Sequence, residues 1–252
     1  MSWDIVFLIP LGLIMGVITS IAGGAGVFAV PAMLAFGLPP VDTLALNRTS
    51  DLGVLIGAAR NYSKVGEGFE VKRILLVAAL LSLGAFVGAQ FSVRVPSDFL
   101  RWFIIFAVFV GIFFLLYPIT PKESANHKPN MFLGIPVLLC VGFWSGSVGM
   151  AGATFAVLVL VTIFRYSFLK ARATDIFAAI PETIISTAVL SLHAQASLSY
   201  YIAMFLSSAL GAYAGSHLAV RRGSNFIRYA MVGVSVLMVI KVLYDLLYIS
   251  FL

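Results

Sequence analysis

The feature that most constrains this chain is a break inside an otherwise continuous apolar segment near its N-terminus. The apolar run from Ile5 to Leu38 is too long for one membrane-spanning helix, which needs ~20 residues. Glycines crowd residues 23–26, and each glycine in a helix interior costs ~1 kcal/mol relative to alanine. Pro31 follows at a distance that suits the first turn of a new helix. The pattern predicts two half-helices joined at an unwound first elbow (residues 23–26), the second half-helix starting near Val27.

The same feature occurs again much further along the chain. The apolar run from Met131 to Phe164 is interrupted at a second elbow (residues 149–152), after which a helix is expected to restart near Ala153. Two glycine-broken apolar segments in corresponding halves are the best sequence indication of a transporter's substrate site. The elbow residues expected to line that site are Gly23, Gly24, Ala25, Gly26, Gly149, Ala151 and Gly152.

Composition places the chain in a lipid bilayer. Of its 252 residues, 61% are hydrophobic and 10% are charged, whereas soluble domains carry ~25% charged residues. The apolar runs lack the alternating pattern of a barrel strand and are far longer than one, which predicts an all-α integral membrane protein. The net charge of +6 comes from basic residues between the apolar runs, so it indicates membrane orientation and not a nucleic-acid partner.

We expect each half of the chain to hold one broken run, forming a re-entrant helical hairpin, followed by three transmembrane helices. The spans expected after the broken runs are 43–62, 74–93, 99–117, 173–192, 200–220 and 229–249. Together the halves would make one membrane domain. Its parts are a first membrane repeat at 1–119, a linker at 120–130 and a second membrane repeat at 131–252.

Internal duplication supports this plan. Gly84–Gly88 and Gly211–Gly215 share the pattern Gly-Ala-aromatic-x-Gly, and arginine, serine and tyrosine positions match at the same displacement. An Arg-x-x-Asp pattern that starts at Arg48 recurs at Arg172. Apolar bias does not explain matching polar positions, so we interpret the chain as an internal repeat.

Charge then distinguishes parallel from inverted repeats. If each broken run leaves the membrane on the side where it entered, nearly all basic residues share one side, and only Arg94 and Arg101 lie in loops opposite. Cytoplasmic loops carry an excess of Lys and Arg, so this arrangement is favoured over one in which each broken run crosses once. Three full crossings per half invert the halves and leave both termini on the outer, periplasmic side. The basic side holds Arg60, Lys64, Lys72, Arg73, Lys122, Lys128, Arg165, Lys170, Arg172, Arg221, Arg222 and Arg228.

The elbows are candidates for an anion site. Unwound backbone is tolerated at membrane depth only where it is buried in protein or lines a wet cavity. The restarting half-helices would direct unpaired N–H groups and positive dipole ends into that cavity, which suits an anion. Small residues also let membrane helices approach closely, and we assign this packing role to Gly16, Gly84, Gly88, Gly211 and Gly215.

Two arginine–aspartate pairs could contribute to the site. Each pair, Arg48 with Asp51 and Arg172 with Asp175, is spaced to meet on one helix face. Ionisable groups at membrane depth are functional candidates. Both pairs also lie near expected helix starts, where a carboxylate complements the helix dipole, and this structural interpretation is slightly favoured for the aspartates. Further donors that suit an oxyanion are Asn47, Thr49, Ser50 and Thr174.

Glu182 follows Pro181 inside an apolar span. A carboxylate there could carry a proton, or it could bond to groups freed by a proline kink; both interpretations stay open. The chain shows no metal-ligand cluster, nucleophile motif or phosphate-binding loop. We therefore expect no enzyme activity, catalytic residue, cofactor or metal, and a membrane-bound enzyme or scaffold is the least favoured class.

The glycine elbow followed by Val30–Leu34, the segment Asn47–Ser50 and the duplicated second half resemble the TauE/SafE sulfite exporter family. The resemblance covers essentially the whole chain. It implies a secondary carrier of sulfite or small organosulfonates in the bacterial inner membrane. In the second half, Met150 replaces a glycine and Val157 stands in place of the proline, which implies an asymmetric site. The site residues that the resemblance implies are Gly23, Gly24, Gly26, Asn47, Arg48, Thr49, Gly149, Gly152 and Arg172.

Taken together, we expect a secondary active transporter of a small sulfur-containing anion. The anion would bind near the midplane between facing half-helix N-termini and move by alternating access. Proton coupling through Glu182, Asp51 or Asp175 is a weaker expectation, and a passive anion channel is the alternative. The expected partners are the anion and the lipid bilayer, and formation of a homo-oligomer is left open.

Overall fold

The computed structural model describes residues 3–65, 70–116 and 131–249, and within them every regular element is a helix. The first half contains α1 (Trp3–Ala22), α2 (Gly26–Ala35), α3 (Pro40–Tyr62), α4 (Val71–Arg94) and α5 (Ser97–Leu116). The second half contains α6 (Met131–Val148), α7 (Gly152–Thr162), α8 (Phe168–Ser191) and α9 (Leu198–Ile249). Within α9, Gly223 has non-helical backbone angles and divides the element into two helices. The expected linker at 120–130 lies outside the described residues.

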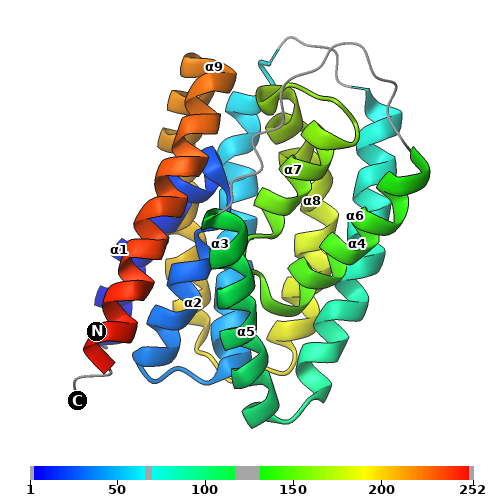
Figure 1. Ribbon diagram of the computed structural model, residues 1–252. Helices are drawn as coiled ribbons and strands as arrows, with labels where there is room; N and C mark the ends of the chain where they lie inside the picture. The colour runs from blue at the N-terminus through cyan, green and yellow to red at the C-terminus, as the bar shows by residue number, and fades with distance from the viewer. Residues whose placement is uncertain (1–2, 66–69, 117–130, 250–252) are drawn as a thin grey trace.

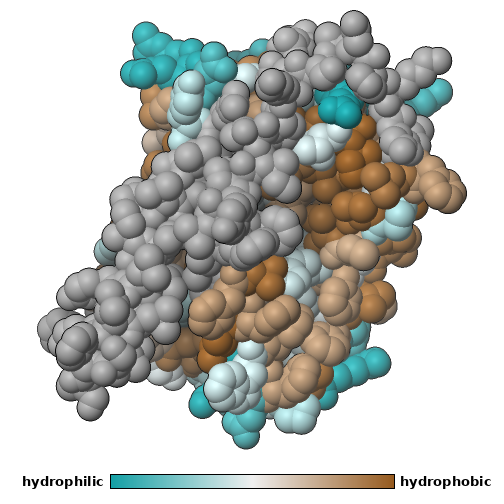
Figure 2. Space-filling view, in the orientation of Figure 1, coloured by the Kyte–Doolittle hydropathy of each residue, from teal (hydrophilic) through white to brown (hydrophobic). Residues whose placement is uncertain are grey.

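Several helices have the length and composition of membrane spans. Among the described residues, four meet both criteria, at Ile5–Ala22, Val71–Arg94, Phe168–Ser191 and Leu198–Ile227. Large apolar side chains such as Leu83 and Leu210 are exposed, as expected for groups that face lipid. In Figure 2 hydrophobic residues cover much of the visible flank, while hydrophilic ones gather toward its two ends. The fold is that of an all-α protein suited to a bilayer.

The two halves pack on each other in a reciprocal way. Helix α1 packs along α9, and α6, its counterpart in the second half, packs along α4. Helix α3 packs on α9, α8 packs on α4, and α3 and α8 also touch. In Figure 1 the α2–α3 connection lies at the bottom and the α7–α8 connection near the top. Each broken helix is thus held mainly by the opposite half of the chain.

Glycines make this close packing geometrically feasible. A Cβ atom at Gly84 would lie 2.3 Å from the Leu139 carbonyl oxygen, and one at Gly211 would lie 2.2 Å from the Leu13 carbonyl oxygen. Gly16, Gly88 and Gly215 face backbone or side-chain atoms of the opposite half at similarly short range. The predicted packing role of these glycines is therefore confirmed.

Two local predictions were wrong. Helix α2 begins directly after the elbow, at Gly26, so Pro31 lies in the helix interior instead of its first turn, where it cannot donate to the Val27 carbonyl. Helix α8 begins at Phe168 because the Ser167 hydroxyl accepts a hydrogen bond from the Lys170 N–H at 3.2 Å, an N-cap. Arg172, expected to precede the span at 173–192 on the basic side, is consequently buried within α8.

The reciprocal packing predicts that Gly88→Ala destabilises the protein. The new Cβ would lie 2.1 Å from the Phe143 carbonyl oxygen, and backbone cannot yield cheaply. We expect a loss of about 1–3 kcal/mol, the usual effect of overpacking, measured by thermal unfolding in mild detergent. The control is Ala188→Val on the exposed face of α8; equal unfolding midpoints in the two variants would contradict this packing role.

Candidate functional site

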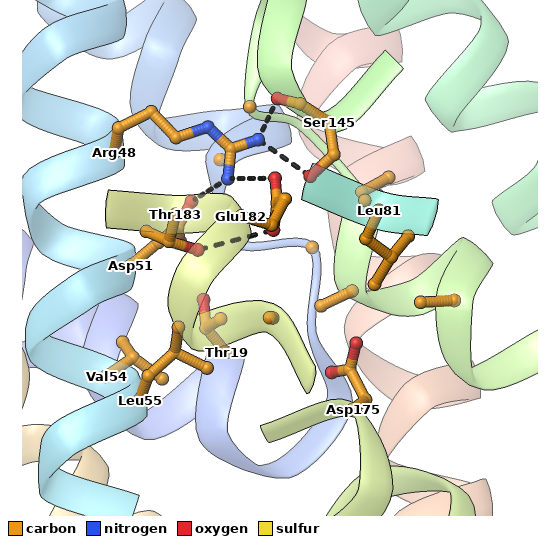
Figure 3. Close-up of a pocket in the computed structure, with 18 of the residues that line it drawn as sticks. Thr19, Arg48, Asp51, Val54, Leu55, Leu81, Ser145, Asp175, Glu182 and Thr183 are labelled. Atoms are coloured by element: carbon orange, nitrogen blue, oxygen red, sulfur yellow. Dashed lines mark hydrogen bonds and ion pairs between the residues drawn. The ribbon is translucent and has the colours of Figure 1, made fainter. Parts of the chain in front are cut away.

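A buried cavity lies where the two elbows meet helices α3 and α8. Its volume is about 40 Å³, whereas one water needs ~10–15 Å³, so it can hold several atoms of a small solute. Figure 3 shows the polar side chains of α3, α6 and α8 that converge on it. The lining residues are Thr19, Gly24, Ala25, Gly26, Arg48, Asp51, Val54, Leu55, Leu81, Val141, Ser145, Gly149, Ala151, Gly152, Ala153, Ala156, Arg172, Asp175, Ala179, Glu182 and Thr183.

Backbone geometry explains why glycine forms the elbows. Gly23, Gly24 and Gly149 have φ values of 75°, 76° and 69°, in the left-handed region that glycine enters without strain. A Cβ at Gly152 would lie 2.3 Å from the Ser145 hydroxyl oxygen, so space as well as conformation is limiting. The breaks at both elbows are confirmed.

The N-termini of α2 and α7 both border the cavity. Helix α2 starts at Gly26 and α7 at Gly152, each a lining residue and each one residue before the predicted restart. The first N–H groups of a helix have no partner within it, and the N-terminus carries a positive partial charge. Both half-helices therefore direct a positive partial charge to the cavity, and at α2 the Val27 and Phe28 N–H groups already donate to the Gly24 and Ala25 carbonyls.

Arg48 lies at the centre of the polar cluster in Figure 3. Its Nη1 atom is 3.2 Å from Asp51 Oδ2 and 3.6 Å from Glu182 Oε1. Its Nη2 atom donates to the Ser145 carbonyl oxygen and to the Ser145 hydroxyl, the latter at 2.8 Å. Its Nε–H is buried without a hydrogen-bond partner. One donor of this guanidinium thus remains available.

Arg172 occupies the equivalent place in the second half, with different surroundings. Its Nη1 atom donates to Asp175, its Nη2 atom to the Thr19 carbonyl oxygen, and its Nε atom to the Ser20 carbonyl oxygen at 3.4 Å. All three nitrogens therefore have protein partners. Arg172 thus binds the C-terminal end of α1 through two backbone carbonyls.

Each arginine caps a helix of the opposite half. Arg48, on α3, binds the Ser145 carbonyl at the end of α6, and Arg172, on α8, binds the Thr19 carbonyl at the end of α1. The same carbonyls accept bonds from the elbow N–H groups of Gly149, at 2.8 Å, and Gly23, at 3.0 Å. Basic groups at a helix C-terminus satisfy its last carbonyls and complement its dipole, so these bonds hold both breaks in place.

Carboxylates outnumber guanidinium groups around the cavity. Asp51, Asp175 and Glu182 face Arg48 and Arg172, so with every group ionised the lining has an excess of negative charge. The Asp175 Oδ1 atom has no hydrogen-bond partner. Like charges at low dielectric repel strongly, so this excess of negative charge opposes the binding of an anion while all three carboxylates are ionised.

The structure brings most of the predicted site residues together. Gly23, Asn47 and Thr49 do not line the cavity. Asn47 donates to the Gly149 carbonyl at 3.0 Å, and Thr49 donates to the Ala45 carbonyl of its own helix at 2.9 Å. The other predicted members do line it, namely Gly24, Ala25, Gly26, Arg48, Asp51, Gly149, Ala151, Gly152, Arg172, Asp175 and Glu182.

The helix-dipole interpretation of the aspartates was wrong. Helix α3 begins at Pro40, so Asp51 lies in its middle, and Asp175 lies in the third turn of α8. A helix dipole acts within the first turn only. Both carboxylates instead pair with arginines beside the cavity.

Sequence reasoning missed Ser145, Thr19 and Thr183. A signal for the first two existed, because a hydroxyl residue stands four positions before Gly23 and before Gly149. Nothing in the sequence marked Thr183, whose hydroxyl donates to Glu182 Oε2 at 3.3 Å. Within residues 3–65, 70–116 and 131–249, no group of three His, Cys, Asp or Glu side chains could hold a metal ion.

Comparison with known proteins gives a consistent result. The family model described as sulfite exporter TauE/SafE matches residues 8–242. A probable membrane transporter protein, ORF9 of Sinorhizobium sp., is 30% identical over 241 residues, covering 95% of this chain and 92% of the relative. The probable membrane transporter protein YfcA of Escherichia coli K12 is 31% identical over 242 residues, covering 93% and 88%. No solved structure matches the chain.

The hydrogen bonds that Arg172 makes to Asp175 and to the end of α1 predict that Arg172→Gln destabilises the protein even without a bound anion. The change leaves Asp175 as a buried charge without its partner, which typically costs about 3–5 kcal/mol, and it removes one of the two hydrogen bonds to the Thr19 carbonyl. The double variant Arg172→Gln/Asp175→Asn should recover part of the loss. Thermal unfolding of the anion-free protein tests this; a double variant no more stable than the single one would contradict it.

Proposed function

Because the chain belongs to the sulfite exporter TauE/SafE family, we propose that it is a secondary active transporter of a small sulfur-containing anion, sulfite or an organosulfonate. The relatives are named probable membrane transporter proteins, which indicates a multi-pass membrane transporter rather than an enzyme. The proposed location is the bacterial inner membrane, with both termini on the periplasmic side. The substrate, the coupling and the orientation are parts of this proposal.

One observation carries the substrate class: the N-termini of two half-helices border the same cavity as Arg48, whose Nε–H has no hydrogen-bond partner. Backbone N–H groups and a guanidinium are donors without acceptors, and they match the oxygens of a sulfite or sulfonate group. Arg48 is the proposed direct ligand. Arg172, whose nitrogens all have protein partners, is proposed to position the first elbow.

Alternating access is proposed to follow from two inverted repeats. The reciprocal packing of α1 on α9 and of α6 on α4 supports a two-fold relation between the halves. So do the short approaches of Gly84 to α6 and of Gly211 to α1. Rocking of one repeat against the other around a fixed midplane site is the usual motion of such carriers.

Proton coupling follows from the charge balance of the cavity. An arriving anion adds negative charge beside Asp51 and Glu182, both of which face Arg48. We propose that Glu182 takes up one proton as the anion binds, becomes a neutral carboxylic acid and releases Arg48 Nη1 to the anion. Transport would then be proton–anion symport. In this proposal Asp51 and Asp175 remain partners of the arginines.

A passive anion channel is the alternative. A channel needs a continuous wet path, whereas the cavity beside Arg48, Asp51 and Ser145 has a volume of only about 40 Å³. That small volume favours the carrier. Conductance far above carrier turnover, with no saturation and no counterflow, would instead favour the channel.

We expect sulfite or a sulfonate to raise the thermal stability of the purified protein. A ligand stabilises the folded state by RT ln(1 + [L]/Kd), about 2.7 kcal/mol when [L] is 100 times Kd. The series is sulfite, sulfate, taurine, sulfoacetate and chloride. Arg48→Ala should abolish this rise in thermal stability. Arg94 lies at the end of α4, so the control Arg94→Ala should preserve it. A protein that responds to none of these anions would overturn the substrate class.

We expect Glu182→Gln to separate coupling from binding. The amide mimics a protonated carboxylate, so sulfite counterflow in proteoliposomes should continue while accumulation driven by a pH gradient falls at least 10-fold. In wild-type protein, acidification of the side from which sulfite enters should accelerate uptake, because Glu182 must gain a proton. A Glu182→Gln variant with the rate and pH dependence of the wild type would remove proton coupling from the proposal.

A further inference from the structure

A stripe of hydroxyl residues extends from the cavity along α8. Thr183, Thr187 and Ser191 are spaced four residues apart, so they follow one another along one face of the helix. Thr183 lines the cavity and donates to Glu182. Ser191 is the last residue of α8. The stripe therefore joins the proposed proton-binding group to one end of the helix.

The two outer members of this stripe lack hydrogen-bond partners. Thr187 Oγ1 and Ser191 Oγ are buried without one. Other hydroxyls in these helices donate to a carbonyl of their own helix: Ser186 to Glu182 at 3.0 Å and Thr162 to Leu158 at 2.6 Å. Buried polar atoms are normally hydrogen-bonded to protein or to water. A buried hydroxyl that does not donate to a carbonyl of its own helix needs another partner, and water is the one we infer here.

The spacing of the stripe fits single waters between its members. Four residues advance an α-helix by ~6 Å, and two successive O–H···O bonds of ~2.8 Å span nearly that length. One water between Thr183 and Thr187, and a second between Thr187 and Ser191, would complete a chain of hydrogen bonds. Each hydroxyl can accept one bond and donate another, as proton transfer along such a chain requires.

The far end of the stripe lies near the α8–α9 connection, where Ser191 Oγ is still buried and the next residue, Leu192, is exposed. The Tyr201 hydroxyl faces Ser191 and is near Asp42, and Asp42 Oδ1 accepts a hydrogen bond from the Gln195 N–H at 2.8 Å. The adjacent His193 is exposed. Figure 1 shows this end of α8 at the bottom, opposite the α7–α8 connection. The stripe thus leads away from the side that carries most of the basic loops.

Helix α3 does not repeat the inner end of this stripe. The residues of α3 that correspond to Glu182 and Thr183 are Ala58 and Ala59. Around Glu182 itself, the charged groups are Arg48 and Asp51 from α3 and Arg172 and Asp175 from α8, while α4, α6 and α7 contribute uncharged residues to the lining. Glu182 is thus the one cavity carboxylate that the stripe reaches.

We propose that Thr183, Thr187, Ser191 and the waters between them conduct protons between Glu182 and the surface at the α8–α9 connection. This rests on the proposed proton–anion symport and deepens it by giving the proton a path. A proton enters at the surface, each oxygen of the chain accepts one and passes one on, and Glu182 changes from carboxylate to carboxylic acid. The reverse sequence returns it.

The first test measures sulfite-dependent proton uptake into proteoliposomes with an internal pH dye, alongside sulfite counterflow. Thr187→Val removes the hydroxyl with little change in shape and should reduce proton uptake at least 10-fold while counterflow is unchanged. Thr187→Ser should restore uptake. The matched control is Thr162→Val, whose hydroxyl donates within α7. Wild-type proton uptake in Thr187→Val would overturn the route.

The second test needs no substrate and judges the route even if sulfite is not transported. In a Cys140→Ala background, Thr187→Cys and Ser191→Cys are exposed to Ag⁺, and the thiols that remain are counted by maleimide labelling after denaturation. Both should react, whereas Leu190→Cys, at a site in the apolar core that is 1% exposed, should be protected. Protection of Thr187→Cys and Ser191→Cys would show a dry stripe and overturn the route. Absence of any wild-type sulfite movement would instead overturn the proposed function.

Discussion

The arrangement of this protein depends on how two broken helices keep their backbone groups satisfied at membrane depth. Each break leaves unpaired carbonyls at the end of one half-helix and unpaired N–H groups at the start of the next. Lipid cannot form hydrogen bonds with either kind of group. Arg48 and Arg172 supply the missing donors crosswise, each to the helix end of the opposite half. The elbows therefore exist only when both halves are docked, which ties the site to the whole fold.

This use of arginine creates an electrostatic problem whose solution shapes the chemistry. A buried guanidinium needs a carboxylate beside it, because an unpaired charge in this environment costs several kcal/mol, and Asp51 and Asp175 serve that need. Once paired, neither arginine attracts an anion strongly. Glu182 adds a further carboxylate on the side of Arg48 only, so the two arginines, equivalent in sequence, differ in what they can bind.

The sequence allowed the elbows and the arginine–aspartate pairs to be predicted because both depend on local rules: glycine conformation in the first case and the spacing of side chains on a helix in the second. It did not reveal which carbonyls Arg48 and Arg172 reach, since those lie about a hundred or more residues away and are brought near only by packing. The misplaced start of α8 had another origin. Serine is a common N-cap residue, so Ser167 could have indicated the helix start, but the neighbouring basic residues suggested a loop.

Asymmetry between the halves is the property that duplication alone would not provide. A perfectly two-fold site would offer the same groups to both sides of the membrane. In this chain the carboxylate at Glu182 and the hydroxyls that follow it along α8 have alanines, Ala58 and Ala59, as their first counterparts in α3. The scaffold can therefore retain its reciprocal packing while the proposed proton route follows one helix and leads to one side only.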